Sequence, residues 1–297
     1  MHGIAYTEIV VSYNCVVLVK QVPDTKRITG QAMNDDGTVN RAALPAIFNP
    51  EDLNALELAL QIRDAHGGRV TVITMGLPAA AEVLRQALYR GADEAVLVTD
   101  RRCAASDTLA TSYILSCAVR KLSFDIVLCG RQAIDGDTAQ VGPQLAEKLA
   151  IPQITYVEHL VALDGRTITA RRNIGAGRQE VRARLPILLT VIDTANEPRA
   201  PAARRLMKYK NARARAELQN DDGALTRALE AKGLLIKQWD LDCVGADLRW
   251  CGRDGSPTKV HRIQSVVLAA KQTRQVAPTQ QDVNAMIHEL IEDHTIG

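Results

Sequence analysis

The chain has 297 residues, of which 46% are hydrophobic but only 3% aromatic, and a formal net charge of +2. This length suits one large domain or one domain with an extension, and a core of Ala, Val, Ile and Leu is typical of parallel sheets covered by helices. The balanced charge gives no indication of nucleic-acid binding. No apolar run approaches the roughly 20 residues that cross a bilayer, so no membrane insertion is expected.

The N-terminal stretch 1–14 precedes the first predicted strand and is interpreted as an extension. It contains Glu8 and lacks a basic n-region, so it is unlike a signal peptide. The six cysteines show no CxxC spacing, which favours reduced thiols in a cytoplasmic protein over an iron–sulfur or zinc site. They are Cys15, Cys103, Cys117, Cys129, Cys243 and Cys251.

Strands and helices alternate through the first half of the chain. Apolar runs predict strands at 15–20, 69–75, 94–98 and 124–129. Helical periodicity, with capping residues and terminal glycines, predicts helices at 50–65, 79–89, 107–122 and 144–150. This alternation indicates a doubly wound, mostly parallel α/β sheet with right-handed crossovers.

The alternation of strands and helices ends after residue 152. Strands are predicted at 154–163 and 166–172 around the turn Asp164-Gly165, and a further strand at 181–193 is interrupted by Pro186. We therefore expect an antiparallel edge on the sheet. The predicted α/β domain spans residues 15–197.

A basic segment follows, at residues 198–216, with seven Lys and Arg side chains and no acid between Arg199 and Arg215. It is either a solvated face or a surface for an acidic protein partner. Residues 217–297 are too thin to form a core of their own and are expected to be an arm packed on another subunit. A last helix is predicted at 279–293.

The loop at residues 130–143 (GRQAIDGDTAQVGP) follows an apolar strand and leads into a helix. This layout presents free backbone N–H groups to a phosphate. It can also be purely structural. Asp135 and Asp137 would repel a bare phosphate, so either they face away and bond a ribose hydroxyl or the loop binds no anion closely.

Other motifs are weaker. Gly175-Ala176-Gly177 precedes a strand rather than a helix and is interpreted as a turn between edge strands. His288 and His294 are six residues apart, which places them on different helix faces, so no metal site is expected. Walker-type phosphate loops and GxSxG nucleophile elbows do not occur in the sequence.

Four segments together resemble the β subunit of electron-transfer flavoproteins, in the family order. They lie at 19–25 (VKQVPDT), 49–52 (NPED), 130–135 (GRQAID) and 196–199 (NEPR). The resemblance covers nearly everything from Cys15 to Lys210. It implies an adenine-nucleotide α-hydrolase-like sheet that pairs with an α subunit carrying a mobile flavin domain. The β subunit then holds either a structural AMP or, in bifurcating members, a second FAD.

The residues after Gln132-Ala133-Ile134 distinguish these two types. The AMP type typically reads Asp-Asp-Asp-Cys-Asn-Gln there, whereas this chain reads DGDTAQVGP, which is similar to the FAD-holding group. Gly136 agrees, because a missing side chain lets a larger ligand approach the backbone. The run 106–112 (SDTLATS) also resembles that group.

The resemblance implies a set of cofactor-binding residues. The hydroxyls of Thr108 and Thr111 would hydrogen-bond the isoalloxazine ring, Asp52 matches a further flavin contact, and the others match adenine, ribose and phosphate contacts. The full set is Asn49, Asp52, Met75, Thr108, Thr111, Gly130, Arg131, Gln132, Ala133, Ile134, Asp135, Gly136, Asp137, Thr138, Ala139 and Gln140.

One departure from the family concerns partner docking. The AMP type anchors its dehydrogenase partner with an exposed Leu, where this chain has Ala203. A more electrostatic contact is therefore expected. The candidate partner-binding residues are Arg199, Ala203, Arg204, Arg205, Lys208 and Lys210.

The function that this resemblance implies is electron bifurcation. NADH would give a hydride to FAD in the β subunit, and the electrons would divide between the α-subunit FAD with an acyl-CoA dehydrogenase and ferredoxin or flavodoxin, without a side-chain catalyst. The alternative is an ordinary electron carrier with structural AMP. A third interpretation is a stand-alone nucleotide-binding module, which the basic segment and the arm disfavour.

Overall fold

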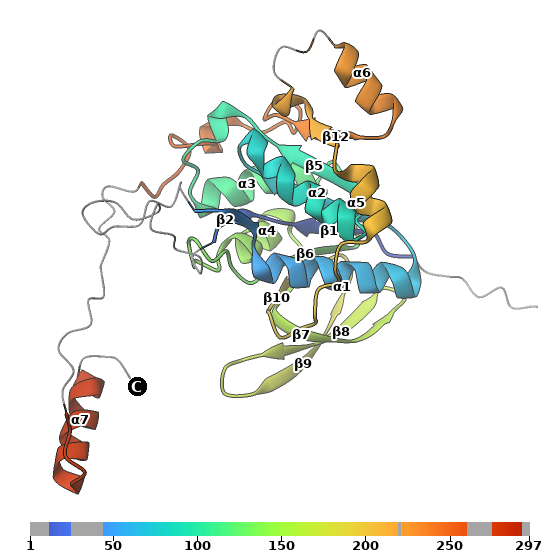
Figure 1. The fold of residues 1–297 in the computed structure, drawn as a ribbon. Helices are drawn as coiled ribbons and strands as arrows, with labels where there is room; N and C mark the ends of the chain where they lie inside the picture. The colour runs from blue at the N-terminus through green and yellow to red at the C-terminus, as the bar shows by residue number, and fades with distance from the viewer. Residues whose placement is uncertain (1–11, 25–43, 219–220, 222, 260–274, 293–297) are drawn as a thin grey trace, which may run out of the picture.

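A computed structural model describes residues 12–24, 44–218, 221, 223–259 and 275–292 (Figure 1). Its centre is one ten-stranded sheet with the order β11-β12-β5-β4-β1-β6-β10-β7-β8-β9. Neighbouring strands are parallel from β11 through β7, and the last two pairings are antiparallel. The predicted fold class, a mostly parallel α/β sheet with an antiparallel edge, is confirmed.

The strands of the large sheet are β1 (Cys15–Leu18), β4 (Val70–Met75), β5 (Glu94–Val98), β6 (Ile126–Gly130), β7 (Gln153–Asp164), β8 (Thr167–Asn173), β9 (Arg178–Arg184), β10 (Ile187–Val191), β11 (Arg213–Ala214) and β12 (Leu235–Trp239). A separate antiparallel pair consists of β2 (Gln21–Pro23) and β3 (Ala46–Phe48). The helices are α1 (Pro50–His66), α2 (Ala81–Arg90), α3 (Thr108–Val119), α4 (Val141–Leu149), α5 (Ala203–Tyr209), α6 (Ala224–Ala231) and α7 (Gln280–Glu292).

Helices cover both faces of the sheet and create two apolar cores. Along β1, Cys15 and Val17 pack in the core with α1 and α2, whereas Val16 and Leu18 pack in the core with α3 and α4. This alternation follows from the two-residue period of a strand, and because both faces are buried the whole strand is apolar. The loops at the edge of the sheet are therefore anchored to strands that are buried on both faces.

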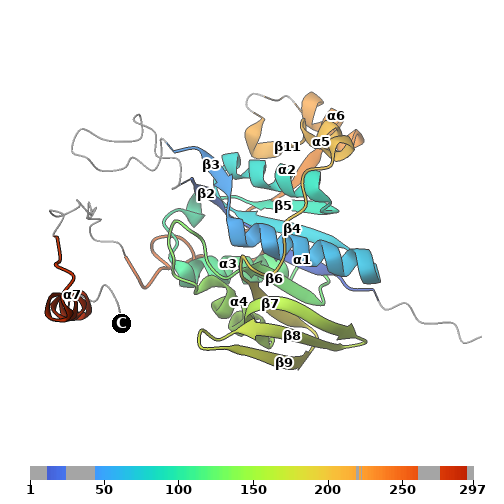
Figure 2. The same ribbon diagram turned by 60° about the horizontal axis from the view of Figure 1, so that its bottom comes forward.

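The antiparallel edge differs from the prediction in one respect. The turns at Asp164-Gly165 and at 174–177 join β7, β8 and β9 as expected, and Figure 2 shows these strands side by side. The segment predicted as one strand at 181–193 is instead two strands that lie far apart in the sheet. β9 ends at Arg184, and after Pro186 the chain enters β10 between β6 and β7. Proline lacks the N–H that a continuous ladder would need.

The sheet also continues past the boundary expected at residue 197. β11 and β12 come from the stretches assigned to the basic segment and the arm, and β12 pairs in parallel with β5. Short apolar runs such as Leu235–Trp239 carry a weak strand signal, and only pairing with an existing edge fixes them. The predicted last helix is present as α7, which buries no residue. The N-terminal residues 1–11 and His294 lie outside the described residues.

Candidate cofactor site

The loop 131–140 lies where ligands usually bind in an open parallel sheet. It follows the carboxyl end of β6, and β6 is the neighbour of β1 on the side opposite β4. The chain order therefore reverses between β1 and β6, and the crevice at such a switch point is the usual ligand site. The N-terminus of α1 lies at the same edge, since Asn49 N donates to Lys20 O just beyond β1.

The first turn of α1 holds the loop by its backbone. Asn49 is fully buried; its Nδ2 donates to Gln132 O at 2.9 Å and its Oδ1 accepts from Ile134 N at 3.1 Å. Glu51 Oε2 accepts from Gln132 N at 3.0 Å, and Glu51 Oε1 lies 2.9 Å from Arg131 Nη2. Asn49 and Glu51 thus hold Arg131, Gln132 and Ile134 at the loop entrance, and Arg131 is the one of these that contributes its side chain.

Asp52 ties together the ends of two central strands. Its Oδ1 accepts from Gly130 N at 2.9 Å and its Oδ2 from Lys20 N at 2.8 Å. Burial raises the pKa of Asp52 to about 7, and these two backbone donors act in the opposite direction. Because both carboxylate oxygens bind backbone N–H groups, Asp52 holds the ends of β1 and β6 together where the loop begins.

Gly130 is required by this packing. A Cβ placed there would lie 2.5 Å from Asp52 Oδ1 and 2.9 Å from Asp52 N. Gly142, in the first turn of α4, is similar, since its Cβ would lie 2.9 Å from Cys129 Sγ and 2.8 Å from Thr190 Cγ2. These glycines bring α1 and α4 close to the strand ends. At Gly136, in contrast, an added Cβ would meet no atom within 4 Å, so the loop itself does not need a glycine there.

Both loop aspartates contact neighbouring side chains. The Asp135 carboxylate lies 2.7 Å from Lys20 Nζ, and Asp137 Oδ1 accepts from Gln132 Nε2 at 2.9 Å. Both pairs are partly exposed, so they contribute little to stability. Their effect is local: the side chains are drawn toward neighbouring groups, which leaves the backbone of the loop to face a ligand.

Backbone N–H groups are available in the second half of the loop. Asp137 and Ala139 have φ angles of 47° and 52°, in the left-handed region, and Gln140 returns to right-handed geometry at φ −99°. Alternation of this kind turns successive N–H groups toward one side and creates an anion-binding concavity. Among the described residues, no hydrogen-bond acceptor is found for the backbone N–H groups of residues 138–142. These donors and the N-terminus of α4 suit a phosphate.

The N-terminal turn of α3 forms the other wall. Asp107 caps this helix by accepting from Ala110 N at 2.9 Å. Thr108 Oγ1 donates to Gln140 Oε1 at 2.8 Å, which brings α3 against the end of the loop. Thr111 is one turn further along the same helix and is also half-buried. The structure therefore brings Thr108 and the loop together, with Thr111 on the next turn of α3. Met75, at the end of β4, is half-buried at the same edge.

Two of the six candidate partner-binding residues are occupied within the chain. Arg199 Nε lies 2.8 Å from Glu57 Oε2 and Arg199 Nη1 lies 2.8 Å from Asp64 Oδ2. Arg205 donates through Nε to Leu88 O at 2.6 Å and through Nη2 to Ala92 O, and so caps the end of α2. These side chains hold the basic segment onto the domain.

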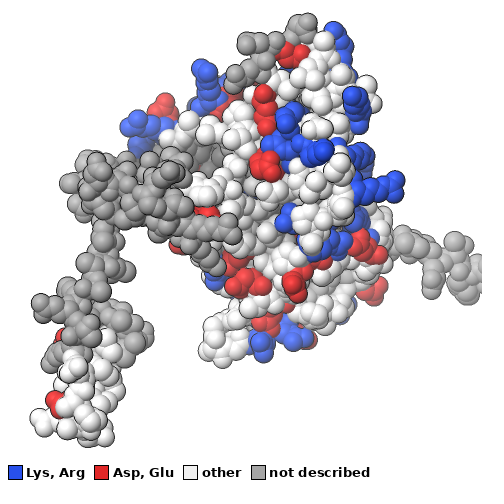
Figure 3. Space-filling model, in the orientation of Figure 1, with Lys and Arg blue, Asp and Glu red and all other residues white. Residues whose placement is uncertain are grey.

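The other four candidates, Ala203, Arg204, Lys208 and Lys210, are exposed. Blue side chains gather over α5 in Figure 3, with red ones nearby. The exposed apolar side chains of Leu206 and Met207 lie on the same helix. The free surface of α5 is therefore basic and apolar together.

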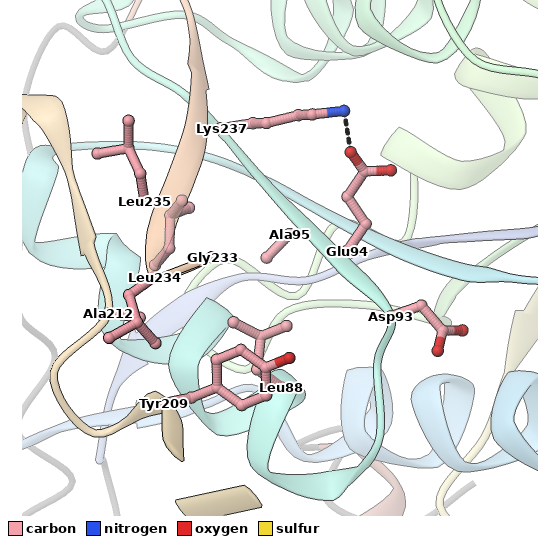
Figure 4. Close-up of a pocket in the computed structure, with 11 residues that line it drawn as sticks. Leu88, Asp93, Glu94, Ala95, Tyr209, Ala212, Gly233, Leu234, Leu235 and Lys237 are labelled. Atoms are coloured by element: carbon pink, nitrogen blue, oxygen red, sulfur yellow. Dashed lines mark ion pairs between the residues drawn. The ribbon is translucent and has the colours of Figure 1, made fainter. Parts of the chain in front are cut away.

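A separate small pocket lies at the opposite end of the strands. Figure 4 shows it between the end of α2, the start of β5 and the start of β12, lined among others by Leu88, Tyr209 and Leu234. An ion pair between Lys237 and Glu94 lies beside it. Ligands of open parallel sheets bind at the carboxyl ends of the strands, so we do not assign the cofactor to this pocket.

Glu51 and Lys20 are parts of the site that were not predicted. They lie inside the segments 49–52 and 19–25, and the signal for Glu51 is a pair of adjacent acids at a helix start that follows a strand. No group of three or more metal-ligating side chains occurs among the described residues, and none of the described helices could span a membrane.

The comparisons with known proteins agree with this geometry. Residues 36–217 match the model of the electron transfer flavoprotein domain. The chain is 40% identical to an electron transfer flavoprotein subunit beta of Clostridium acetobutylicum, over 95% of this chain and 100% of the relative. It is 41% identical to Protein FixA of Sinorhizobium fredii over 93% and 91%. It is 48% identical to an acryloyl-CoA reductase electron transfer subunit gamma of Anaerotignum propionicum, over 62% and 69%.

Proposed function

The chain belongs to the electron transfer flavoprotein family as a β subunit, and from this premise we propose that it binds FAD, takes electrons from NADH and bifurcates them. β subunits of this family pair with an α subunit. Of the hydride's two electrons, one would go to the FAD of the α subunit and an acyl-CoA dehydrogenase, and the other to ferredoxin or flavodoxin, while the proton would be released to solvent. FAD supplies this chemistry when bound, since it accepts a hydride and gives up single electrons.

The observation that carries the proposal is the open space at Gly136, beside backbone donors that suit a phosphate. An added Cβ at this position would touch nothing, so the glycine serves no purpose in packing and leaves the loop backbone accessible to a large ligand. AMP is smaller than FAD and does not need this opening. The wall formed by Thr108 and Thr111 supports the same choice, because it offers hydroxyl groups to a ring system beyond the phosphates.

The roles of the chain's own residues follow from their contacts. The N–H groups of residues 138–142 and the N-terminus of α4 bind the phosphates, while Asn49 and Glu51 orient the loop and Asp52 holds the strand ends beneath it. Thr108 and Thr111 hydrogen-bond the ring and adjust its electron affinity. Met75 contacts the adenine, with the remaining residues of the loop 130–137 around the ribose.

The acyl-CoA dehydrogenase partner is supported by the relative from Anaerotignum propionicum, whose name states that it serves an acryloyl-CoA reductase. The surface that suits this partner is the exposed face of α5, with Arg204, Lys208 and Lys210 around Leu206 and Met207. We further propose that the protein is cytoplasmic.

The test is a count of cofactors in the purified α/β pair. Two FAD molecules per heterodimer, both reduced by NADH, are expected. One FAD with one AMP and no reaction with NADH would contradict the proposal and establish the ordinary electron carrier, which the same fold accommodates. Gly136→Asp in the same pair provides a matched variant: it should reduce FAD binding in the β subunit and leave AMP binding in place.

A further inference from the structure

The segment that follows β12 returns to the wall of the site formed by α3. Residues 240–258 lie against the loop 100–107 and the first turns of α3, although more than 130 residues separate them in the sequence. Leu241 is fully buried, and Val244 and Cys251 are almost so, in the core that also contains Ile114 and Ala118 of α3. This contact is therefore part of the folded domain.

The contact is closest at the cap of α3. Asp107 uses one carboxylate oxygen to cap the helix, by accepting from Ala110 N at 2.9 Å, and the other to accept from Thr258 N at 3.0 Å. An N-cap needs only one oxygen. The second oxygen therefore joins the helix start to the returning segment.

Ser256 makes the second connection. It is only 3% exposed; its Oγ accepts from Asp107 N at 2.9 Å and donates to Gly252 O at 2.6 Å. Gly252 N in turn donates to Ser106 Oγ at 3.1 Å. The residue immediately before Thr108 is thus held at both its backbone N–H and its carboxylate by residues 256 and 258.

Two glycines of the returning segment are packed too closely to carry a side chain. Gly252 has φ 62°, and a Cβ there would lie 2.2 Å from Arg102 O; a Cβ at Gly255 would lie 2.2 Å from Cys251 N. Earlier in the same segment, Asp247 N donates to the Tyr113 hydroxyl at 2.9 Å. These contacts place the segment in one register on α3.

We propose that residues 252–258 are positioning residues for the cofactor site: through Asp107 and Ser256 they set the direction of Thr108 and Thr111 toward the flavin ring. The inference rests on the proposed function, because it requires a ring on this wall. It extends that function to a part of the chain that contains none of the expected cofactor contacts. Residues 252–258 therefore determine ring binding without touching the phosphates.

Two substitutions isolate this connection. Ser256→Ala removes the hydroxyl that holds Asp107 N. Asp107→Asn retains an oxygen for Ala110 N, since Asn caps helices as well as Asp does, but it presents an NH2 group where Thr258 N needs an acceptor. Arg253→Ala, at an exposed position of the same segment, is the matched control.

The measurement is the affinity of the purified α/β pair, stripped of its β-subunit cofactor, for FAD and for AMP. Loss of one buried hydrogen bond is expected to weaken FAD binding about fivefold in each variant. AMP binding should be nearly unchanged, because Thr108 contacts the loop through the Gln140 side chain and not through its backbone donors. The double variant should bind FAD more weakly than either single variant, since each substitution removes a different hydrogen bond to Asp107. Arg253→Ala should match the wild type.

Each result has a distinct meaning. Unchanged FAD binding in both variants would overturn the inference, as would equal losses of FAD and AMP, which indicate general destabilisation. A wild-type pair that binds AMP but not FAD in the β subunit would overturn the proposed function and this inference together. Binding of AMP alone would be seen in the wild-type pair, before any variant is made. Failure of the proposed function can therefore be distinguished from failure of the inference about residues 252–258.

Discussion

The two walls of the candidate site are fixed in different ways. The loop 130–140 is held by the first turn of α1, where Asn49, Glu51 and Asp52 are buried and bind backbone groups directly above the central strands. The start of α3 is held from outside the sheet centre, by residues 252–258. The phosphate-facing wall therefore depends on the core of the domain, whereas the ring-facing wall depends on a late segment of the chain.

The largest expected effect concerns the buried carboxyl beneath the first wall. The pKa of Asp52, about 7, exceeds the 3.8 of a free carboxyl, so the folded protein binds this proton more tightly than the unfolded chain. The stabilisation that the protonated Asp52 carboxyl gives the folded state is fully present below pH 4 and is lost as the pH rises to 7. Relative to Asp52→Asn, the wild type should lose on the order of 4 kcal/mol over this range, at 1.36 kcal/mol per pKa unit.

Urea unfolding of the α/β pair from pH 4 to pH 8 measures this difference in the free energy of unfolding. The exposed Asp254→Asn variant is the control and should run parallel to the wild type. If the difference in the free energy of unfolding between the wild type and Asp52→Asn stayed constant with pH, the pKa of Asp52 would not be raised in the folded protein.

The next effect compares two glycines of one loop. Gly130→Ala should lower the free energy of unfolding by about 2–3 kcal/mol, because the new Cβ meets the α1 backbone and Asp52 and forces them apart. Gly136→Ala should change it by less than about 0.5 kcal/mol, since its Cβ meets open space. Thermal or urea unfolding measures both, and equal losses would show that the loop is not held as described.

Asn49→Ala should act on binding. The loop loses its hydrogen bonds at Gln132 O and Ile134 N, so affinity for AMP and for FAD should fall together by about tenfold, the effect of roughly 1.4 kcal/mol. Titration calorimetry of the cofactor-stripped pair measures this. A loss confined to FAD would contradict the assignment of this wall to the phosphates.

Thr108→Val should give the smallest effect and the opposite selectivity. The hydroxyl offered to the ring disappears while the volume is kept, so FAD should bind about fivefold more weakly. AMP should bind nearly as before, because Thr108 contacts the loop through the Gln140 side chain and not through its backbone donors. Ser116→Ala removes a hydroxyl from the buried part of the same helix and is the control. Equal weakening of AMP by Thr108→Val would remove the distinction between the two walls.

Much of this arrangement could be predicted from the sequence. The helices and the strands of the large sheet up to residue 150 follow from apolar runs and helical periodicity, whereas the short β2–β3 pair was not predicted. The loop after β6 was predicted because small polar residues stand between a strand and a helix. The split of 181–193 into β9 and β10 could not be predicted, since a Pro in an apolar run does not say which strands its two halves will join.

The supports of the site were harder to find than the site itself. Glu51 looks like an ordinary acid in a first helical turn, where it would favour the helix dipole, and Asp52 was expected to contact the flavin. Only the fold shows that Glu51 binds the loop and that both oxygens of Asp52 bind backbone N–H groups at the strand ends. The contact of Ser256 with Asp107 spans 149 residues and depends on tertiary packing. Arg199 and Arg205 were expected to face a partner, but local charge density does not reveal their intramolecular acceptors.

The place of β10 has a consequence for protein synthesis. This strand lies between β6 and β7, although both precede it in the chain, so a nascent chain released only to residue 186 leaves two unpaired strand edges in the middle of its sheet. Such edges invite pairing with other chains. The residue that opens the loop, Arg131, donates its N–H to Val191 O at the end of β10. A ribosome that paused before residue 191 would therefore expose both an aggregation-prone gap and an unfinished nucleotide loop.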